Sequence, residues 1–247
     1  MATIEGIDVE VNADAVVVTA VAPLTVLSSA VAGGGLGRAR TIVNLHVDKN
    51  CPWEGAGVRL DAFAARRDLP APWVGLLTAA WTEHARVAVE HAEGVGALVV
   101  VTVGLSNPIA AGWSTAAGAL PGTINTIAVV DADLEPAALV NLVITLTEVK
   151  ALVLAEAGVV ADGRRASGTS TDAVVVAATG RGRALRFGGP ISDAGWVVAR
   201  AARTALDDGV RQWLEGKRGT LPGFPYPQDG KRGTLPGFPY PQDGKKK

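Results

Sequence analysis

The sequence is poor in cysteine and carries no excess of either charge. Cys51 is the single cysteine among 247 residues, which excludes an intramolecular disulfide and is typical of a reducing compartment. The 23 Lys and Arg residues are balanced by 24 Asp and Glu, so the chain has no overall field that would attract nucleic acid. We therefore expect a small molecule as the partner and no nucleic acid.

The sequence also lacks the long apolar runs of a membrane protein. Stretches such as Ala97 to Val103 fall far short of the roughly 20 residues that a bilayer requires. The first residues, Met1 to Glu5, lack the basic start and apolar block of a secretory signal. Apolar residues still make up 48% of the chain, with an excess of Ala and Val that suits close helix-to-sheet packing. We expect a cytoplasmic protein with no transmembrane segment and no membrane partner.

Strand and helix patterns alternate along the first 216 residues. Runs rich in Val and Ile predict strands, and apolar residues at helical spacing predict helices. The expected strands are Asp14 to Val21, Leu24 to Ser29, Arg40 to Val47, Ala97 to Val103, Ile124 to Val130 and Asp172 to Ala178. The expected helices are Gly55 to Arg67, Thr78 to Glu93, Pro136 to about Glu156, and Gly195 to Leu214. The mixture indicates an α/β (α+β) layered domain, residues 1–216, with helices flanking mixed β-sheets, an αββα sandwich being one arrangement.

The end of the chain differs in kind. KRGTLPGFPYPQDG at residues 217–230 is repeated without change at 231–244, and three lysines follow. Such Pro and Gly density cannot build a core, so we expect residues 217–247 to be a flexible or appended tail. A docking peptide for an aromatic-lined groove is the functional alternative.

The most informative motif is Gly168 to Ala173, where two Thr, one Ser and Asp172 precede the strand at Val174. Folding alone rarely requires so many hydroxyls and a carboxylate at the mouth of a strand, which suggests a polar site. The alternative is a turn whose side chains bond their own backbone. Both interpretations stay open from local sequence.

Other motifs exclude common kinds of site. The glycine run Gly33 to Gly37 lacks the Lys-Ser/Thr ending of a phosphate loop, and no G-x-S-x-G elbow occurs. His84 and His91 lie seven residues apart on an expected helix, a poor zinc spacing, so we expect a solvated helix face and no metal site. His46, between Asn44 and Asp48, could instead titrate usefully near neutral pH.

Polar clusters follow or precede several apolar strands, and on one rim they would form a pocket of hydroxyls and amides. Such groups activate nucleophiles and bind oxyanions without a metal. The clusters are Ser28 to Ser29, Asn44 to His46, Ser106 to Pro108, Gly122 to Thr126 and Gly168 to Asp172.

Together these clusters resemble the adenosylcobinamide amidohydrolase family. The matching segments are Leu27 to Ala30 with Gly33 to Gly35, Ile42 to Val47, Leu77 to Ala80, Gly104 to Asn107, Gly122 to Thr126, Thr147 to Lys150, and Gly168 to Asp172. The resemblance implies hydrolysis of the amide that joins the aminopropanol arm to the corrin ring system, giving adenosylcobyric acid for cobalamin salvage. The implied substrate is a corrinoid whose cobalt belongs to the substrate, and no cofactor is expected.

The order of segments is also similar, more distantly, to self-processing aminopeptidases of the D-aminopeptidase and β-peptidyl aminopeptidase type. That similarity implies that Thr123 is the nucleophile, Asn107 an oxyanion donor, and Ser170 with Asp172 the activating pair. This sequence departs from that pattern, since Thr123 stands where those enzymes have Ser. Nothing in the sequence shows that the Gly122–Thr123 bond is cleaved to free an α-amine as base.

The remaining polar residues at the expected rim are predicted to bind substrate. They are Ser29, Gly34, Asn44, His46, Ser106, Asn125, Thr169 and Thr171. Trp113 is one of several tryptophans that could pack on a flat ligand or in the core. A corrinoid-binding protein without activity and a general amidase or peptidase are the alternatives, and surface Ala and Val make a homo-oligomer plausible.

Overall fold

The structure is a computed structural model that describes residues 3–49, 51–52, 54–116 and 122–217. The repeated tail beyond Lys217 lies outside these residues. The helices are α1 (Ala56–Arg66), α2 (Pro136–Glu156) and α3 (Asp193–Lys217), with a short 3-10 turn, η1 (Thr82–His84). The longer strands are β1 (Ile7–Val11), β2 (Ala15–Ser28), β3 (Gly35–His46), β4 (Trp73–Thr78), β5 (Arg86–Ala92), β6 (Val95–Val103), β8 (Ile124–Asp131) and β13 (Ala173–Ala178). The two-residue strands are β7 (Pro108–Ile109), β9 (Asp133–Leu134), β10 (Val160–Ala161), β11 (Arg164–Arg165), β12 (Gly168–Thr169) and β14 (Ala184–Leu185).

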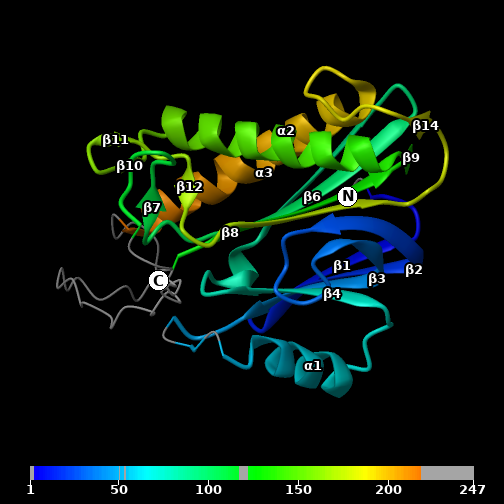
Figure 1. The fold of residues 1–247 in the computed structure, drawn as a ribbon, viewed down its shortest axis with the longest axis horizontal. Coiled ribbons are helices and arrows are strands. Elements are labelled where there is room, and N and C mark those ends of the chain that lie inside the picture. The colour runs from blue at the N-terminus through cyan, green and yellow to red at the C-terminus, as the bar shows by residue number, and fades with distance from the viewer. Residues whose placement is uncertain (1–2, 50, 53, 117–121, 218–247) are drawn as a thin grey trace, which may run out of the picture.

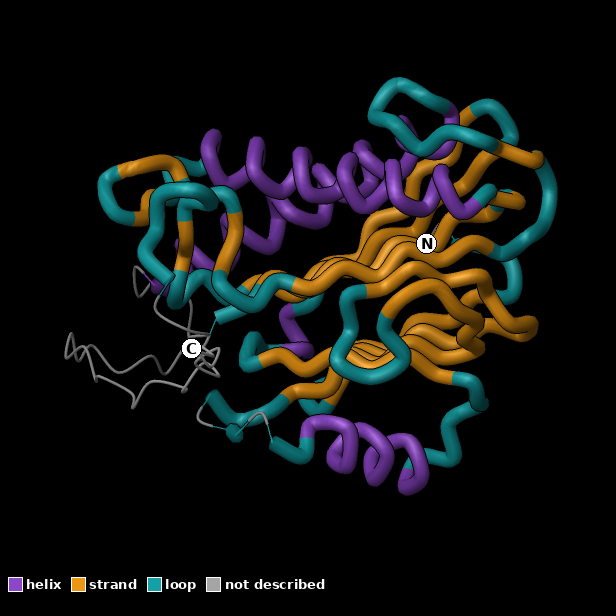
Figure 2. Tube along the Cα trace, in the orientation of Figure 1, coloured by secondary structure: helices purple, strands orange, loops and turns teal. Residues whose placement is uncertain are grey.

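The longer strands form one mixed sheet in the order β4-β3-β2-β13-β8-β6-β5, and β1 pairs with β2. In Figure 1, α2 and α3 cover one side of the strands and α1 covers the opposite side. Figure 2, in the same orientation, shows the strands gathered between these helices. The expected layered domain is confirmed.

The two-residue period of the strands shows how one sheet makes two layers. In β6, Val99 and Val101 pack in the cluster beneath α2 and α3, whereas Leu98 and Val100 pack in a second cluster with residues of β2, β3 and β4. In β2, residues adjacent to that second cluster belong to a third cluster, against α1. The sheet therefore folds on itself, with a core on both faces of each half.

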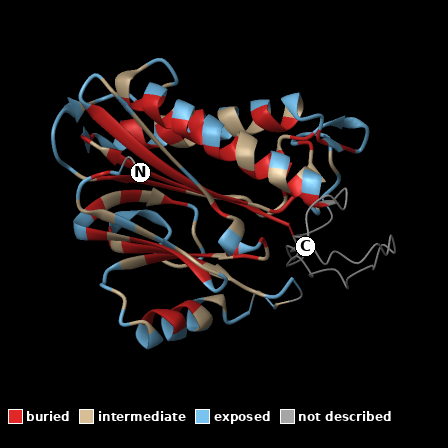
Figure 3. Cartoon of the chain, turned by 180° about the vertical axis from the view of Figure 1, so that it is seen from behind, coloured by how far each residue is buried: buried red, intermediate tan, exposed pale blue. Residues whose placement is uncertain are grey.

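A register shift in β2 allows this folding. The pairing of β2 with β3 is interrupted between Thr19 and Leu24, and such irregularities bend a strand. The first half of β2 then contributes to the layer over α1, and its second half pairs with β13 through Thr25 to Ser28. Buried residues accordingly run along the strands and the inner sides of the helices (Figure 3).

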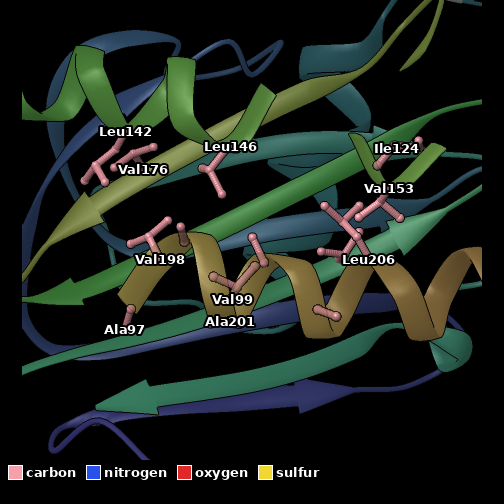
Figure 4. Close-up of a cluster of buried hydrophobic side chains, with 14 of the residues drawn as sticks. Ala97, Val99, Ile124, Leu142, Leu146, Val153, Val176, Val198, Ala201 and Leu206 are labelled. Carbon is pink, nitrogen blue, oxygen red and sulfur yellow. The ribbon is translucent and has the colours of Figure 1, made fainter. Parts of the chain in front are cut away.

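Helix α2 packs as a core helix. Its mean hydropathy of 1.9 makes it the one helix within the described ranges that is long and apolar enough to span a membrane. In the fold, however, Leu142 and Leu146 are buried with Val176 of β13 and Val198 of α3 (Figure 4). Burial of these side chains contributes roughly 1.5–3 kcal/mol each to folding.

The helix predicted from Thr78 to Glu93 is wrong. This segment contains the end of β4, η1 and β5, and β5 pairs antiparallel with β6 from Arg86↔Val101 to Ala92↔Val95. Glu93 and Gly94 both have positive φ, 51° and 73°, the geometry of a two-residue hairpin turn. His84 and His91 therefore lie on η1 and β5 instead of sharing a helix.

Candidate active site

Sheet topology brings three distant segments to one end of the sandwich. Strands β8 and β13 are parallel, with Ala173 opposite Asn125, so Thr123 and Asp172 precede them at the same end. Strand β6 runs antiparallel to β8 and ends with Val103 opposite Ile124. The residues that follow β6, including Asn107, therefore reach this end too.

Short strands then hold the segments together. Strand β7 pairs with β12 through Ile109↔Gly168 and Pro108↔Thr169. The side-chain amide of Asn107 donates to Oγ of Ser170 at 2.7 Å. An amide nitrogen carries two hydrogens, so Asn107 retains one that could reach a substrate oxygen. Asn107 and Ser170 therefore lie side by side.

Asp172 organises the turn before β13. Its Oδ1 accepts hydrogen bonds from Ile124 N at 2.9 Å and Thr169 Oγ1 at 2.5 Å. Its Oδ2 accepts from Thr169 N at 3.0 Å and from Lys150 Nζ at 2.5 Å. The motif thus bonds its own backbone, as the simple turn requires, and also binds the start of β8 and helix α2.

The Lys150–Asp172 ion pair is largely buried. The two side chains are 12% and 10% exposed, so the carboxylate and the ammonium each depend on the other for their charge balance. A Cβ on Gly168 would lie 2.4 Å from Oδ2 of Asp172 and 2.9 Å from Nζ of Lys150. Because Gly168 has no Cβ, the Lys150 and Asp172 side chains have space to form their ion pair.

Lys150 was not among the predicted site residues. It is the single basic residue of the apolar segment Pro136 to Glu156, and a lone cation in such a helix is the signal that could have identified it. Its partner lies 22 residues away in sequence, however, and no local pattern pairs the two.

Thr123 lies next to this pair and is 4% exposed. Its hydroxyl lies 2.8 Å from the backbone oxygen of Thr171 and 3.1 Å from Oδ1 of Asn125. Both oxygens can only accept, so the hydroxyl donates to one of them. Neither is a strong base, and activation of Thr123 would require another group.

The peptide before Thr123 is held closely. The carbonyl oxygen of Gly122 lies 2.9 Å from the hydroxyls of Thr169 and Thr171. Thr171 donates to it, whereas Thr169 shares its single proton between this oxygen and Oδ1 of Asp172. Gly122 has a φ of 132°, a conformation available mainly to glycine. A Cβ there would approach Ser106 Oγ to 2.6 Å, so Ser106 also lies beside the cluster.

Asn44 and Asn125 meet in the interior. The side-chain amide of Asn125 donates to Oδ1 of Asn44 at 2.8 Å and to Leu77 O at 2.9 Å. Asn44 in turn donates to Thr102 Oγ1 at 2.9 Å. Both asparagines and Thr102 are 1% exposed, so in this structure they contact one another and not the surface.

Ser29, Gly34 and His46 lie around this end on other segments. The hydroxyl oxygen of Ser29 accepts from Val174 N at 3.0 Å, while a Cβ on Gly34 would lie 2.6 Å from Ala30 O. His46 Nδ1 is 2.9 Å from Ala80 O, and its ring stacks on Trp81 with centroids 5.1 Å apart.

One tryptophan has an exposed position near the short strands. Trp113 is 65% exposed, and the guanidinium of Arg164 lies 3.4 Å from its ring centroid. The loop that carries it is anchored, because Ser114 Oγ donates to Asp162 Oδ2 at 2.8 Å. Trp113 is thus available to a ligand, whereas Trp53 falls outside the described residues.

No group of three or more His, Cys, Asp or Glu side chains within the described ranges could hold a metal ion. The groups gathered around Thr123 and Asp172 are hydroxyls, amides, one carboxylate and one ammonium. The domain is a layered α+β fold, and hydroxyl and amide groups are those that acyl-transfer enzymes use as nucleophiles and oxyanion donors.

A model of the adenosylcobinamide amidohydrolase family matches residues 1–218, and the chain belongs to this family. The family prediction is confirmed. An adenosylcobinamide amidohydrolase of Halobacterium salinarum is 36% identical over 168 residues, which are 65% of this chain and 64% of that protein. The match thus spans slightly less than two thirds of the relative.

Comparison with solved structures finds two weakly similar chains. A β-aminopeptidase of Burkholderia sp. has a TM-score of 0.45 at 15% identity, covering 83% of this chain and 79% of its own. The PH0078 protein from Pyrococcus horikoshii OT3 has a TM-score of 0.45 at 12% identity, covering 85% and 84%.

Proposed function

We propose that this protein hydrolyses the amide bond between the aminopropanol arm and the corrin ring system of adenosylcobinamide, giving adenosylcobyric acid and aminopropanol. The family match over residues 1–218 carries the proposal. The meeting of Asn107, Thr123 and Asp172 from three segments supports it, because amide hydrolysis needs a nucleophile and oxyanion donors at one point.

Thr123 is the proposed nucleophile. Its Oγ1 attacks the carbonyl carbon of the substrate amide and releases its proton, which passes through Ser170 to the substrate nitrogen. The C–N bond then breaks, and aminopropanol leaves as the neutral amine. Water then hydrolyses the ester to adenosylcobyric acid and restores the hydroxyl. Asn107 Nδ2 is the proposed donor to the oxyanion, through the hydrogen that Ser170 does not take.

The activating group needs more than Ser170 and Asp172 alone. Asp172 already accepts from the backbone N–H groups of Ile124 and Thr169, from the Thr169 hydroxyl and from the Lys150 ammonium. Its proposed part is therefore to fix the turn and to place the Lys150 ammonium near the reacting centre. Ser170, bonded to Asn107, is proposed to relay a proton between substrate and water.

The reaction as proposed uses no cofactor, since the corrinoid cobalt belongs to the substrate. We place the enzyme in the cytoplasm, in a salvage route that returns imported corrinoids to cobalamin synthesis, and a homo-oligomer is compatible with the role. Partially exposed rim groups such as Ser170 and His46, together with Thr169 and Thr171, are proposed to contact the substrate.

The test is to incubate purified protein with adenosylcobinamide and to follow adenosylcobyric acid and aminopropanol by mass spectrometry. Wild type should give both products, and T123A should give neither while keeping its fold by circular dichroism. T145V is a matched control, because Thr145 is another buried threonine whose hydroxyl donates to Gly188 O at 2.9 Å and to none of the site residues.

Tight corrinoid binding by wild type without product would establish the binding-protein alternative. Equal turnover by T123A would remove Thr123 as the nucleophile and leave the proposed amidohydrolase activity standing.

A further inference from the structure

A buried chain of polar side chains crosses the interior between the two layers of the sheet and ends at Thr123. It runs from Thr102 on β6 to Asn44 on β3, returns to Asn125 on β8, and continues to Thr123 Oγ1. The side-chain contacts measure 2.9, 2.8 and 3.1 Å. Polar groups this deeply buried cost stability unless every one is paired.

The direction of each hydrogen bond follows from one backbone carbonyl. Leu77 O can only accept, so the nitrogen of the Asn125 side chain must face it, at 2.9 Å. The second hydrogen of that nitrogen goes to Oδ1 of Asn44. Both hydrogens of Asn125 are then used, and its Oδ1 faces Thr123.

The same logic fixes the other two members. Because Asn44 accepts through Oδ1, its nitrogen is directed at Thr102 Oγ1. At the other end, Thr123 Oγ1 has two acceptors, Asn125 Oδ1 and Thr171 O. The proton of Thr123 is therefore donated to one of these two oxygens, and the lone pairs of its oxygen remain for a group outside the chain.

We propose that Asn44, Thr102 and Asn125 are positioning residues for the amide hydrolysis, and that they hold the Thr123 hydroxyl in its attacking orientation without touching substrate. This inference rests on the proposed function. It replaces the expected substrate-binding role of Asn44 and Asn125, whose side chains are 1% exposed. Removal of a member should lower kcat and leave KM unchanged.

Thr102 offers the cleanest test, because it lies three hydrogen bonds away from Thr123. T102V keeps the shape and removes the acceptor of the Asn44 amide nitrogen. Asn44 can then shift and loosen its hold on the side chain of Asn125, which contacts Thr123. A small misplacement of a reacting group costs up to about 100-fold in rate, and we expect T102V to lower kcat about tenfold or more. T102S restores the hydroxyl and should recover wild-type kcat.

T145V supplies the matched control for a lost buried hydroxyl. Thr145 is 0% exposed and bonds Gly188 O, which takes no part in the polar chain that ends at Thr123. T145V should lose stability comparable to T102V in chemical denaturation, with kcat within twofold of wild type.

The experiment measures kcat and KM for adenosylcobinamide with wild type, T102V, T102S and T145V, each shown to be folded. A selective fall in kcat for T102V, restored by T102S, supports the inference. Unchanged kcat in T102V, a change confined to KM, or an equal fall in T145V would overturn it while the proposed function stands. No product from wild type would overturn both.

Discussion

The buried ion pair between Lys150 and Asp172 makes a specific prediction about stability. Replacing Lys150 by Met keeps much of the side-chain volume but leaves the carboxylate of Asp172, 10% exposed, without a counter-charge. Breaking a buried pair in this way costs about 3–5 kcal/mol. Asp172 keeps three donors, Ile124 N, Thr169 N and Thr169 Oγ1, so we expect the lower end, about 3 kcal/mol.

Removing the carboxylate of Asp172 should lower the free energy of unfolding more than removing the ammonium of Lys150. D172A leaves the ammonium of Lys150 unpaired and also removes the acceptor of two backbone N–H groups. Unsatisfied buried donors cost about 1–3 kcal/mol each, so D172A should exceed K150M by at least that amount. In thermal unfolding, about 3 kcal/mol corresponds to a fall in Tm of roughly 6–12 °C for a chain of this size.

Urea unfolding followed by circular dichroism measures both variants, and R211M provides the control. Arg211 pairs with Asp208 on the surface of α3, where the side chains are 63% and 45% exposed, and such a pair contributes about 0–1 kcal/mol. If K150M lost no more stability than R211M, the pair would not organise the site, and the reasoning would be refuted.

Three further predictions concern glycines and the exposed tryptophan. G122A should destabilise the protein by about 2 kcal/mol or more and abolish turnover, because its Cβ would lie 2.6 Å from Ser106 Oγ. The control is G163A, where φ is 75° and the space is open; its free energy of unfolding should fall by about 1 kcal/mol and its activity should be kept. G168A should separate Lys150 from Asp172, because the new Cβ would lie 2.9 Å from Lys150 Nζ and 2.4 Å from Asp172 Oδ2. Its urea midpoint should therefore be close to that of K150M, and a midpoint equal to that of wild type would contradict this. W113A should keep the free energy of unfolding within about 0.5 kcal/mol of wild type and raise KM for adenosylcobinamide. If KM and the quenching of protein fluorescence by substrate were both unchanged, Trp113 would not contact substrate.

Local signals were sufficient for several elements of the fold. Helix α2 has its predicted bounds, Pro136–Glu156, because proline is favoured at the first helical position and Gly158 provides a positive φ of 72° after the end. The helix predicted from Thr78 to Glu93 was wrong, because the pairing of β5 with β6 in a hairpin outweighed an apparent helical spacing. The Glu93-Gly94 turn was the signal that should have corrected it.

The site was predictable in part for a similar reason. Asn107, Thr123 and Asp172 stand at the ends of apolar strands, and the ends of neighbouring strands meet. The burial of Asn44 and Asn125 was not predictable, because it depends on the folding of the sheet over itself. Lys150 depends on a contact between a helix and a turn that no periodicity encodes.

The bend in β2 also has a consequence for the folding kinetics. Strand β2 pairs with β3, its close neighbour in sequence, but its second half must also wait for β13, where Ser28 faces Val175. Pairings across such sequence separations form late and slowly. A nascent chain that ends before Ala173 can build the β2–β3 hairpin and α1, but it lacks β13, the strand that lies between β2 and β8. We therefore expect the candidate active site to form in the last cooperative step of folding, so that partly synthesised chains are inactive.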